Sequence, residues 1–216
     1  MESTSHTEFS PAMSAVLSGL RKLKTGSLLI VVAVIILGGS LLALLGSIFT
    51  FNVDVVVATL LSWMLLSLIA LVLTLVAVYA YLVPSAWSLA KWKPEEFSVI
   101  SNLLVIGYIG GLVSTLLALV LLIADVTGIT GGSIVVLLLI IVLAIAGVIL
   151  IFIGWIGNVV YFLKLRDAFN SSTFLVAGIL LVLSPLIPLL SIITWILTYI
   201  EASSLEKKLI SGLMKI

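Results

Sequence analysis

Five long apolar runs, none of which contains Asp, Glu, Lys or Arg, constrain the fold of this chain more than any other feature. They cover residues 28–50, 55–83, 98–124, 133–163 and 173–200. A helix needs about 20 apolar residues to cross the hydrocarbon of a bilayer, and each run is long enough. Of the 216 residues, 63% are hydrophobic and 9% are charged, whereas about a quarter of a soluble domain is charged. We therefore expect one all-α membrane domain, a polytopic transmembrane helix bundle of about five spans.

The segments outside this bundle (28–200) are short. Residues 1–27 predict a polar tail followed by an interfacial amphipathic helix, with Ser10-Pro11 as its start. Residues 201–216 predict an amphipathic C-terminal tail that either extends the last span or lies on the membrane surface. The loop 85–97 carries two tryptophans and two lysines, a mixture typical of the headgroup level. Short interfacial helices are thus expected at both ends of the bundle.

Two prolines, Pro185 and Pro188, interrupt the last apolar run. A proline within a helix removes a backbone hydrogen bond and forces a kink. We expect one kinked crossing over 173–200, and a re-entrant hairpin is the alternative. Two full crossings do not fit, because about 20 residues are needed for each.

Lysine and arginine placement predicts the orientation, since basic residues gather on the cytoplasmic side of membranes. With the N-terminus cytoplasmic, loops and the N-terminal segment place seven basic residues inside: Arg21, Lys22, Lys24, Lys91, Lys93, Lys164 and Arg166. A straight fifth crossing leaves three outside: Lys207, Lys208 and Lys215. A re-entrant fifth segment would bring these three inside as well. We expect a multi-pass protein of the cell (plasma) membrane with a cytoplasmic N-terminus.

Residues that carry chemistry are almost absent. The chain has no cysteine, and its single histidine, His6, lies in the polar tail. Cysteine-based sites and a single-chain metal site built on histidines are therefore excluded. The runs hold no ionisable acid or base, which a proton-coupled transporter usually needs at membrane depth, and Asp54 and Asp125 lie in turns. We expect no catalytic residue, no cofactor and no metal, and hence no enzyme. The net charge of +1 provides no basic surface for nucleic acid.

Small residues recur at helical spacing along four of the runs, a pattern that lets helices approach closely in lipid. The members are Gly39, Ala43, Gly46, Ser47 and Thr50; Ser67, Ala70, Thr74 and Ala77; Gly107, Gly111, Ser114 and Ala118; and Ala144, Gly147 and Gly154. These stripes predict packing within the bundle, or a face for a partner chain or a narrow pore.

Two segments echo each other: Ile-Gly-Tyr-Ile-Gly-Gly at 106–111 and Ile-Gly-Trp-Ile-Gly-Asn at 153–158. Both lie toward the cytoplasmic ends of their runs, so they are candidates for neighbours across the bundle. Amide side chains inside lipid must find a partner, and Asn102 and Asn158 are candidates to bond each other or a ligand. The candidate packing and polar contacts are therefore Gly107, Gly111, Gly154, Gly157, Asn102, Asn158, Pro185 and Pro188.

About half of the chain resembles small multispanning membrane proteins of unknown function from Sulfolobus-like crenarchaea. The resemblance rests on Gly-Leu-Arg-Lys-Leu-Lys-Thr-Gly-Ser-Leu at 19–28, on 153–157, and on Tyr-Phe-Leu-Lys-Leu-Arg at 161–166 leading into 170–172. It continues in Ala-Gly-Ile-Leu at 177–180, followed by the prolines of the last run. This resemblance implies an archaeal source and a membrane location, and it implies no activity.

These features favour a non-catalytic membrane protein, either an accessory or scaffold subunit or a self-associating bundle. Its expected partners are membrane lipid and either other membrane chains or further copies of itself. The alternative is a small transporter or channel for a neutral or lipidic solute, with Asn102, Asn158 and the interrupted fifth run as its polar contacts. An enzyme acting on lipid is disfavoured, because no nucleophile–base pair or metal cluster is visible.

Overall fold

The computed structural model describes residues 10–129, 131–187 and 189–213, and this part of the chain contains helices and turns but no strand. The helices are α1 (Pro11–Ile48), α2 (Val53–Val76), η1 (Ala77–Leu82), α3 (Val83–Trp92), α4 (Pro94–Leu104), η2 (Val105–Ile109), α5 (Gly110–Val126), α6 (Ile134–Phe169), α7 (Ser172–Leu183) and α8 (Leu189–Ile210). The expected polar tail 1–9, Pro188 and the chain end 214–216 lie outside the described residues.

Among the described residues, five helices have the length and composition needed to cross a membrane, which confirms an all-α bundle of about five spans. They are Pro11–Ile48, Val53–Trp92, Pro94–Val126, Ile134–Phe169 and Leu189–Ile210. The first four are longer than the predicted runs, because they continue into the polar segments at their ends. Ser10 caps the first, accepting a hydrogen bond from the backbone N–H of Met13 at 3.3 Å, as the sequence predicts.

The boundary expected at residue 27 between an interfacial helix and the first span is absent. α1 runs unbroken from Pro11 to Ile48. The apolar face that predicted a surface helix, including Val16, Leu20 and Leu23, is fully buried where α1 packs against α3 and α8. Because protein covers this face, the segment does not lie on the membrane surface. It is the first part of one long helix, and we call it the root of α1.

The loop expected at 85–97 is also mostly helical. The helix continues through Pro84 to Trp92, and only Lys93 has an extended backbone, with φ −128° and ψ 82°. The π-helical turn η1 precedes the proline, and the N–H of Val83 bonds the carbonyl of Val78, five residues back. This wider turn leaves room for a ring that would clash in a regular helix.

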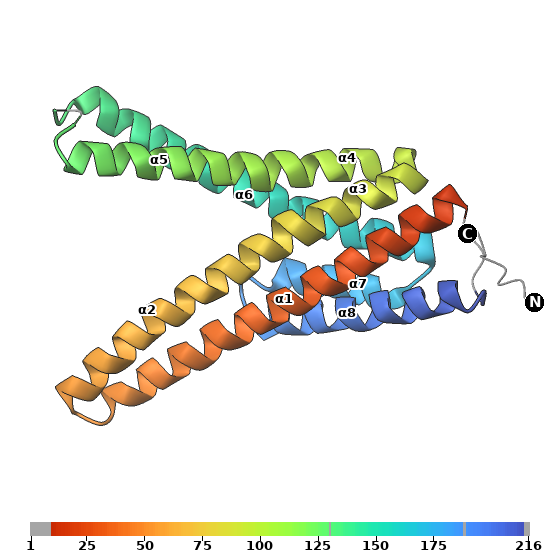
Figure 1. The fold of residues 1–216 in the computed structure, drawn as a ribbon, viewed down its shortest axis with the longest axis horizontal. Coiled ribbons are helices and arrows are strands. Elements are labelled where there is room, and N and C mark those ends of the chain that lie inside the picture. The colour runs from red at the N-terminus through yellow and green to blue at the C-terminus, as the bar shows by residue number, and fades with distance from the viewer. Residues whose placement is uncertain (1–9, 130, 188, 214–216) are drawn as a thin grey trace, which may run out of the picture.

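The helices form two diverging arms on a common base (Figure 1). We call residues 34–76, in α1 and α2, the first arm, and residues 107–154, in η2, α5 and α6, the second arm. α2 packs against α1 and η1, whereas α5 packs against α6 and η2. The arms are therefore two separate helical hairpins, and most of their large apolar side chains are exposed, as expected for surfaces covered by lipid.

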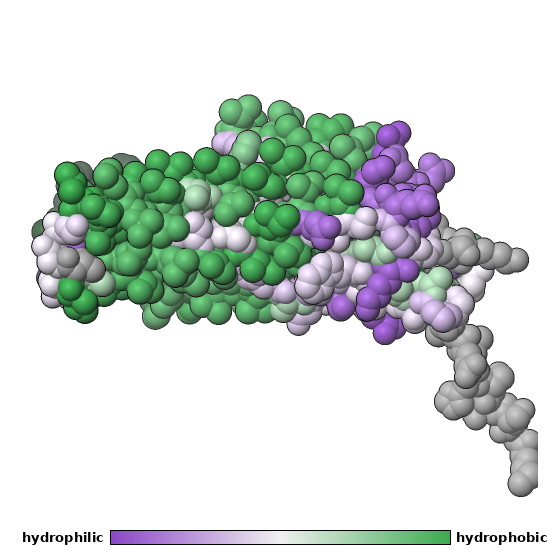
Figure 2. All heavy atoms as spheres, turned by 90° about the horizontal axis from the view of Figure 1, so that it is seen from above, coloured by the Kyte–Doolittle hydropathy of each residue, from purple (hydrophilic) through white to green (hydrophobic). Residues whose placement is uncertain are grey.

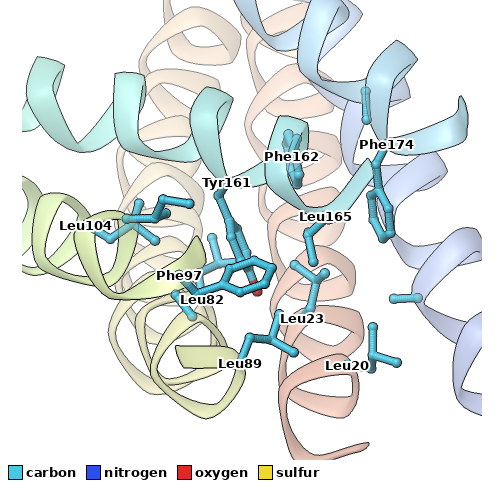
Figure 3. Close-up of a cluster of buried hydrophobic side chains, with 14 of the residues drawn as sticks. Leu20, Leu23, Leu82, Leu89, Phe97, Leu104, Tyr161, Phe162, Leu165 and Phe174 are labelled. Atoms are coloured by element: carbon cyan, nitrogen blue, oxygen red, sulfur yellow. The ribbon is translucent and has the colours of Figure 1, made fainter. Parts of the chain in front are cut away.

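The base, which comprises the remaining helices, holds the packed core of the molecule (Figure 3). Its largest fully buried side chains include Phe97 of α4, Tyr161 and Phe162 of α6, and Phe174 of α7. Rings pack edge-to-face between Phe97 and Tyr161, with centroids 6.1 Å apart, and stack between Phe162 and Phe174 at 6.5 Å. These contacts join α4, α6 and α7, so the base is held by close aromatic packing.

The structure contradicts the single kinked helix expected over 173–200. The helix ends at Leu183, and a turn containing exposed Pro185 leads into α8, which packs back against α7. Ser171, before α7, donates its hydroxyl to Glu201 of α8 at 2.7 Å, so the two helices form a hairpin. α7 is 12 residues long, or about 18 Å, well short of the roughly 30 Å hydrocarbon.

The polar side chains gather at the base end of the molecule (Figure 2). Every charged residue of the described part lies at this end, except Asp54 and Asp125 at the arm tips. Both were expected in turns, but Asp54 lies in the first turn of α2 and Asp125 in the last turn of α5. Glu206 of α8 forms ion pairs with Arg21 and Lys24 of α1. The start of α1 and the end of α8 therefore lie at the same end, which the re-entrant alternative predicts.

Candidate functional site

Two π-helical turns face each other at the fork, the point where the arms leave the base. η1 and η2 contact each other, and Tyr79 of η1 donates its hydroxyl to the backbone carbonyl of Tyr108 in η2 at 2.6 Å. A π turn disturbs the regular ladder of helix hydrogen bonds and often occurs at functional sites. Here the Tyr108 carbonyl serves as the acceptor that links the second arm to η1, where the first arm leaves the base.

The structure brings the two echoing segments, 106–111 and 153–158, together at the fork. The backbone at Gly107 lies against Gly154, where a Cβ on Gly107 would come 2.2 Å from the Gly154 nitrogen. A Cβ on Gly111 would come 2.7 Å from the side chain of Ile151. No side chain fits at either position, so both glycines are needed for the close approach of η2 and α5 to α6.

Asn158 is the polar centre of this contact. Its side chain is buried at 3% exposure, and its amide nitrogen donates to the hydroxyl of Tyr108 at 2.5 Å. Its carbonyl oxygen is buried with no hydrogen-bond partner among the described residues. Of the two alternatives for these amides, a bond between Asn102 and Asn158 is not formed, because Asn102 lies on the exposed side of α4.

The remaining candidates divide between the fork and other places. Gly157 packs near the fork, where a Cβ would meet Leu104 at 3.2 Å. Pro185 lies in the exposed turn between α7 and α8, and Pro188 is outside the described residues. The fork therefore gathers five of the sequence candidates: Gly107, Gly111, Gly154, Gly157 and Asn158.

Two buried contacts in the base are not apparent from the sequence. Ser85 of α3 donates its hydroxyl to the carbonyl of Gly19 at 2.7 Å and lies 2.7 Å from the hydroxyl of Tyr161. Gly19 allows this approach, since a Cβ there would come 2.9 Å from Leu89. In the sequence, only a glycine within the apolar face of α1 indicates that another helix approaches closely there.

The second contact is the ion cluster of Glu206, in the charged last turns of α8 (201–210), beyond the apolar part of that helix. Arg21 donates to its carboxylate at 2.8 Å, and Lys24 bonds the other oxygen. Partial burial raises the pKa of the Glu206 carboxyl, but the hydrogen bonds and charges of Lys24 and Arg21 outweigh burial and hold its pKa below the ordinary value. The cluster fixes α8 against the root of α1.

The chemistry of the fork is that of a structural polar network with one spare acceptor. It combines two phenols, an amide and a backbone carbonyl, and within the described ranges no three His, Cys, Asp or Glu residues gather as a metal site. Comparison with protein-family models, with curated proteins and with solved structures finds no match for this chain.

Proposed function

We propose that this chain is a non-catalytic scaffold protein of the membrane that associates with further copies of itself through the first arm. The observation that carries the proposal is an open face on α1. Gly39, Ala43 and Gly46 lie along one side of the helix and are all exposed. A Cβ added to Gly39 or Gly46 would meet nothing within 4 Å, so another helix has space to approach.

Such a face suits a second copy of the same chain. Small residues spaced by three or four positions are how helices associate in lipid, where apolar area alone gives no driving force. A two-fold symmetric contact uses the same patch on both partners, and one helix with a glycine stripe provides both halves. The charged residues at the base end lie far from this stripe along α1.

The interior of the first arm also favours an assembled state. A hollow of about 270 Å³ lies between α1 and α2, lined by residues that include Ala33, Ser67 and Thr74. The indole N–H of Trp63 and the hydroxyl of Ser67 are buried with no hydrogen-bond partner in the described part. An arm whose helix contact contains a hollow, and leaves two buried polar groups without a partner among the described residues, has the most to gain from a further helix.

The test is the mass of the intact particle after extraction in mild detergent, measured by native mass spectrometry. We expect a homo-oligomer that becomes monomeric in the double variant Gly39→Leu/Gly46→Leu. The matched control is Gly38→Leu, which adds the same side chain to another exposed glycine off the stripe. A monomeric wild-type protein, or association with a different chain only, would overturn self-association.

The proposal includes an orientation with the base on the cytoplasmic side. Every Lys and Arg of the described part lies at the base end, and basic residues favour the cytoplasmic side. Because the chain has no cysteine, single introduced cysteines report sidedness without background. We expect Ser14→Cys and Ser204→Cys to label only from inside, and Thr50→Cys only from outside. Labelling of Ser14 and Ser204 from opposite sides would exclude the hairpin.

A second candidate function is transport of a neutral or lipidic solute, favoured by the unpartnered carbonyl oxygen of Asn158 at the fork. A buried acceptor without a donor costs free energy unless water or a ligand bonds it. Solute flux into reconstituted vesicles that is lost in Asn158→Leu would support this function. Flux unchanged in that variant would remove the fork from the path.

A further inference from the structure

A basic groove runs along the charged end of the molecule between the first turns of α1 and helix α3. Three adjoining hollows of about 370, 440 and 410 Å³ share Lys22 in their walls. α1 contributes Ser18 and Lys22, which are one turn apart on the same face, and α3 contributes Ser88 and Lys91. The groove therefore combines two ammonium groups with serine hydroxyls.

The two lysines in this groove are not neutralised by the protein. Lys22 donates to the hydroxyl of Ser88 at 3.0 Å, which fixes its ammonium group in the wall. Neither Lys22 nor Lys91 forms an ion pair with a carboxylate of the described residues. The neighbouring cations differ, because Glu206 neutralises Lys24 and Glu96 neutralises Lys93. Positive charge is thus left over in the groove. Lys164, Lys207 and Lys208 also form no ion pair with a described residue, but they lie outside its walls.

A tryptophan in its wall indicates that the groove lies at the level of the lipid headgroups. Trp87 forms part of its wall and is 48% exposed, and tryptophan favours the boundary between hydrocarbon and water. The surface over the arms is apolar up to the end of the molecule where the polar side chains gather (Figure 2). A molecule bound at the lysines would have a polar end in the groove and apolar protein surface beside it.

We propose that this groove binds the phosphate-bearing headgroup of an anionic membrane lipid. Lys22 and Lys91 supply the charge for the phosphate, and Trp87 packs against the glycerol and the upper acyl chains. A basic pocket between helices on the cytoplasmic side is the arrangement that recognises anionic headgroups. The site is separate from the stripe of the first arm, so it does not depend on self-association.

The test uses the purified full chain in mild detergent, titrated with phosphatidylglycerol or phosphatidylcholine, with bound lipid counted by native mass spectrometry. We expect phosphatidylglycerol to bind preferentially. The double variant Lys22→Gln/Lys91→Gln should weaken that binding on the order of 30-fold, since each basic residue near an anionic surface contributes about a fivefold effect. Restoring the charge in Lys22→Arg/Lys91→Arg should recover most of the binding.

The matched control is Lys207→Gln/Lys208→Gln, which removes the same charge from the exposed end of α8. An equal loss in this control would overturn the groove, because net charge alone would then explain the binding. Competition with inorganic phosphate and glycerol phosphate tells whether the groove binds the phosphate of a lipid headgroup or a soluble phosphate. If either displaces the lipid at equal concentration, the groove is a soluble-phosphate site and the lipid assignment fails.

Discussion

The two arms contain similar residues but pack in opposite ways. In the second arm small residues face inward: Gly107 lies against Gly154, Gly111 against Ile151, and Ser114 donates to the carbonyl of Leu143 at 2.8 Å. In the first arm the glycines face outward with open space around them. The helix–helix contact there contains a hollow and two unpartnered polar groups.

This difference shows that a stripe of small residues does not by itself determine where the contact forms. In lipid, close packing and interhelical hydrogen bonds supply most of the attraction between helices. The second arm uses both within one chain and is complete as a hairpin. The first arm leaves its stripe unused, which is why we assign association to it.

The largest expected effect is at the fork end of the second arm. Gly107→Leu places a side chain where a Cβ would already come 2.2 Å from the Gly154 nitrogen, so the helices must separate. We expect a loss of about 3 kcal/mol or more in the free energy of unfolding, measured by denaturant titration in micelles. Gly38→Leu in the first arm should change it by less than about 0.5 kcal/mol. A comparable loss of unfolding free energy in both variants would mean that the glycines of the two arms are packed alike.

The parts of the base next to each arm are also stabilised differently. Ion pairs to Glu206 fix α1 below the first arm, and aromatic packing fixes α6 below the second. Glu206→Gln leaves Arg21 and Lys24 without their carboxylate and should cost about 2 kcal/mol. Because the folded pKa of Glu206 is lowered, the cluster stabilises the fold above the ordinary carboxyl pKa. That contribution is lost as the pH falls through the lowered value, so the difference between wild type and variant should vanish in acid. A difference that persists at low pH would show that packing, not charge, is responsible.

Sequence reasoning reached the fold class and the fork because both follow from local patterns. Long uncharged runs give the number of apolar helices, and the repeated Ile-Gly-aromatic-Ile-Gly pattern placed Gly107 and Gly154 together. It gave the hairpin of α7 and α8 only as the alternative to one kinked crossing. A proline pair signals a break in the helix, but the direction of the chain after the break depends on contacts such as Glu206 with Arg21, 185 residues apart.

The partner of Asn158 could not be predicted for a related reason. Its amide bonds the hydroxyl of Tyr108, which the sequence analysis did not single out as a polar contact. Asn102 was the closer chemical match, but helical phase places it on the exposed side of α4. Which side of a helix is buried can be predicted only when the helix that packs against it is known.

A smaller effect is expected where the arms are joined. Tyr79→Phe removes the hydrogen bond from η1 to the Tyr108 carbonyl and should cost about 1 kcal/mol. The informative measurement is the distance between spin labels on Leu61→Cys and Leu117→Cys, two exposed positions on separate arms. We expect the distance distribution to broaden in the variant. An unchanged distribution would mean that the base alone fixes the angle between the arms.

The smallest effect compares one serine in each arm. Ser114→Ala removes the interhelical bond to Leu143 and should destabilise the second arm by about 0.6 kcal/mol, the average for such bonds in membranes. Ser67→Ala removes a buried hydroxyl that has no partner in the described part, so it should leave the monomer unchanged or slightly more stable. Both changes are measured by denaturant titration of the monomeric Gly39→Leu/Gly46→Leu background. If Ser67→Ala destabilises that monomer as much as Ser114→Ala does, the Ser67 hydroxyl has a partner within the chain, and the first arm is as complete as the second.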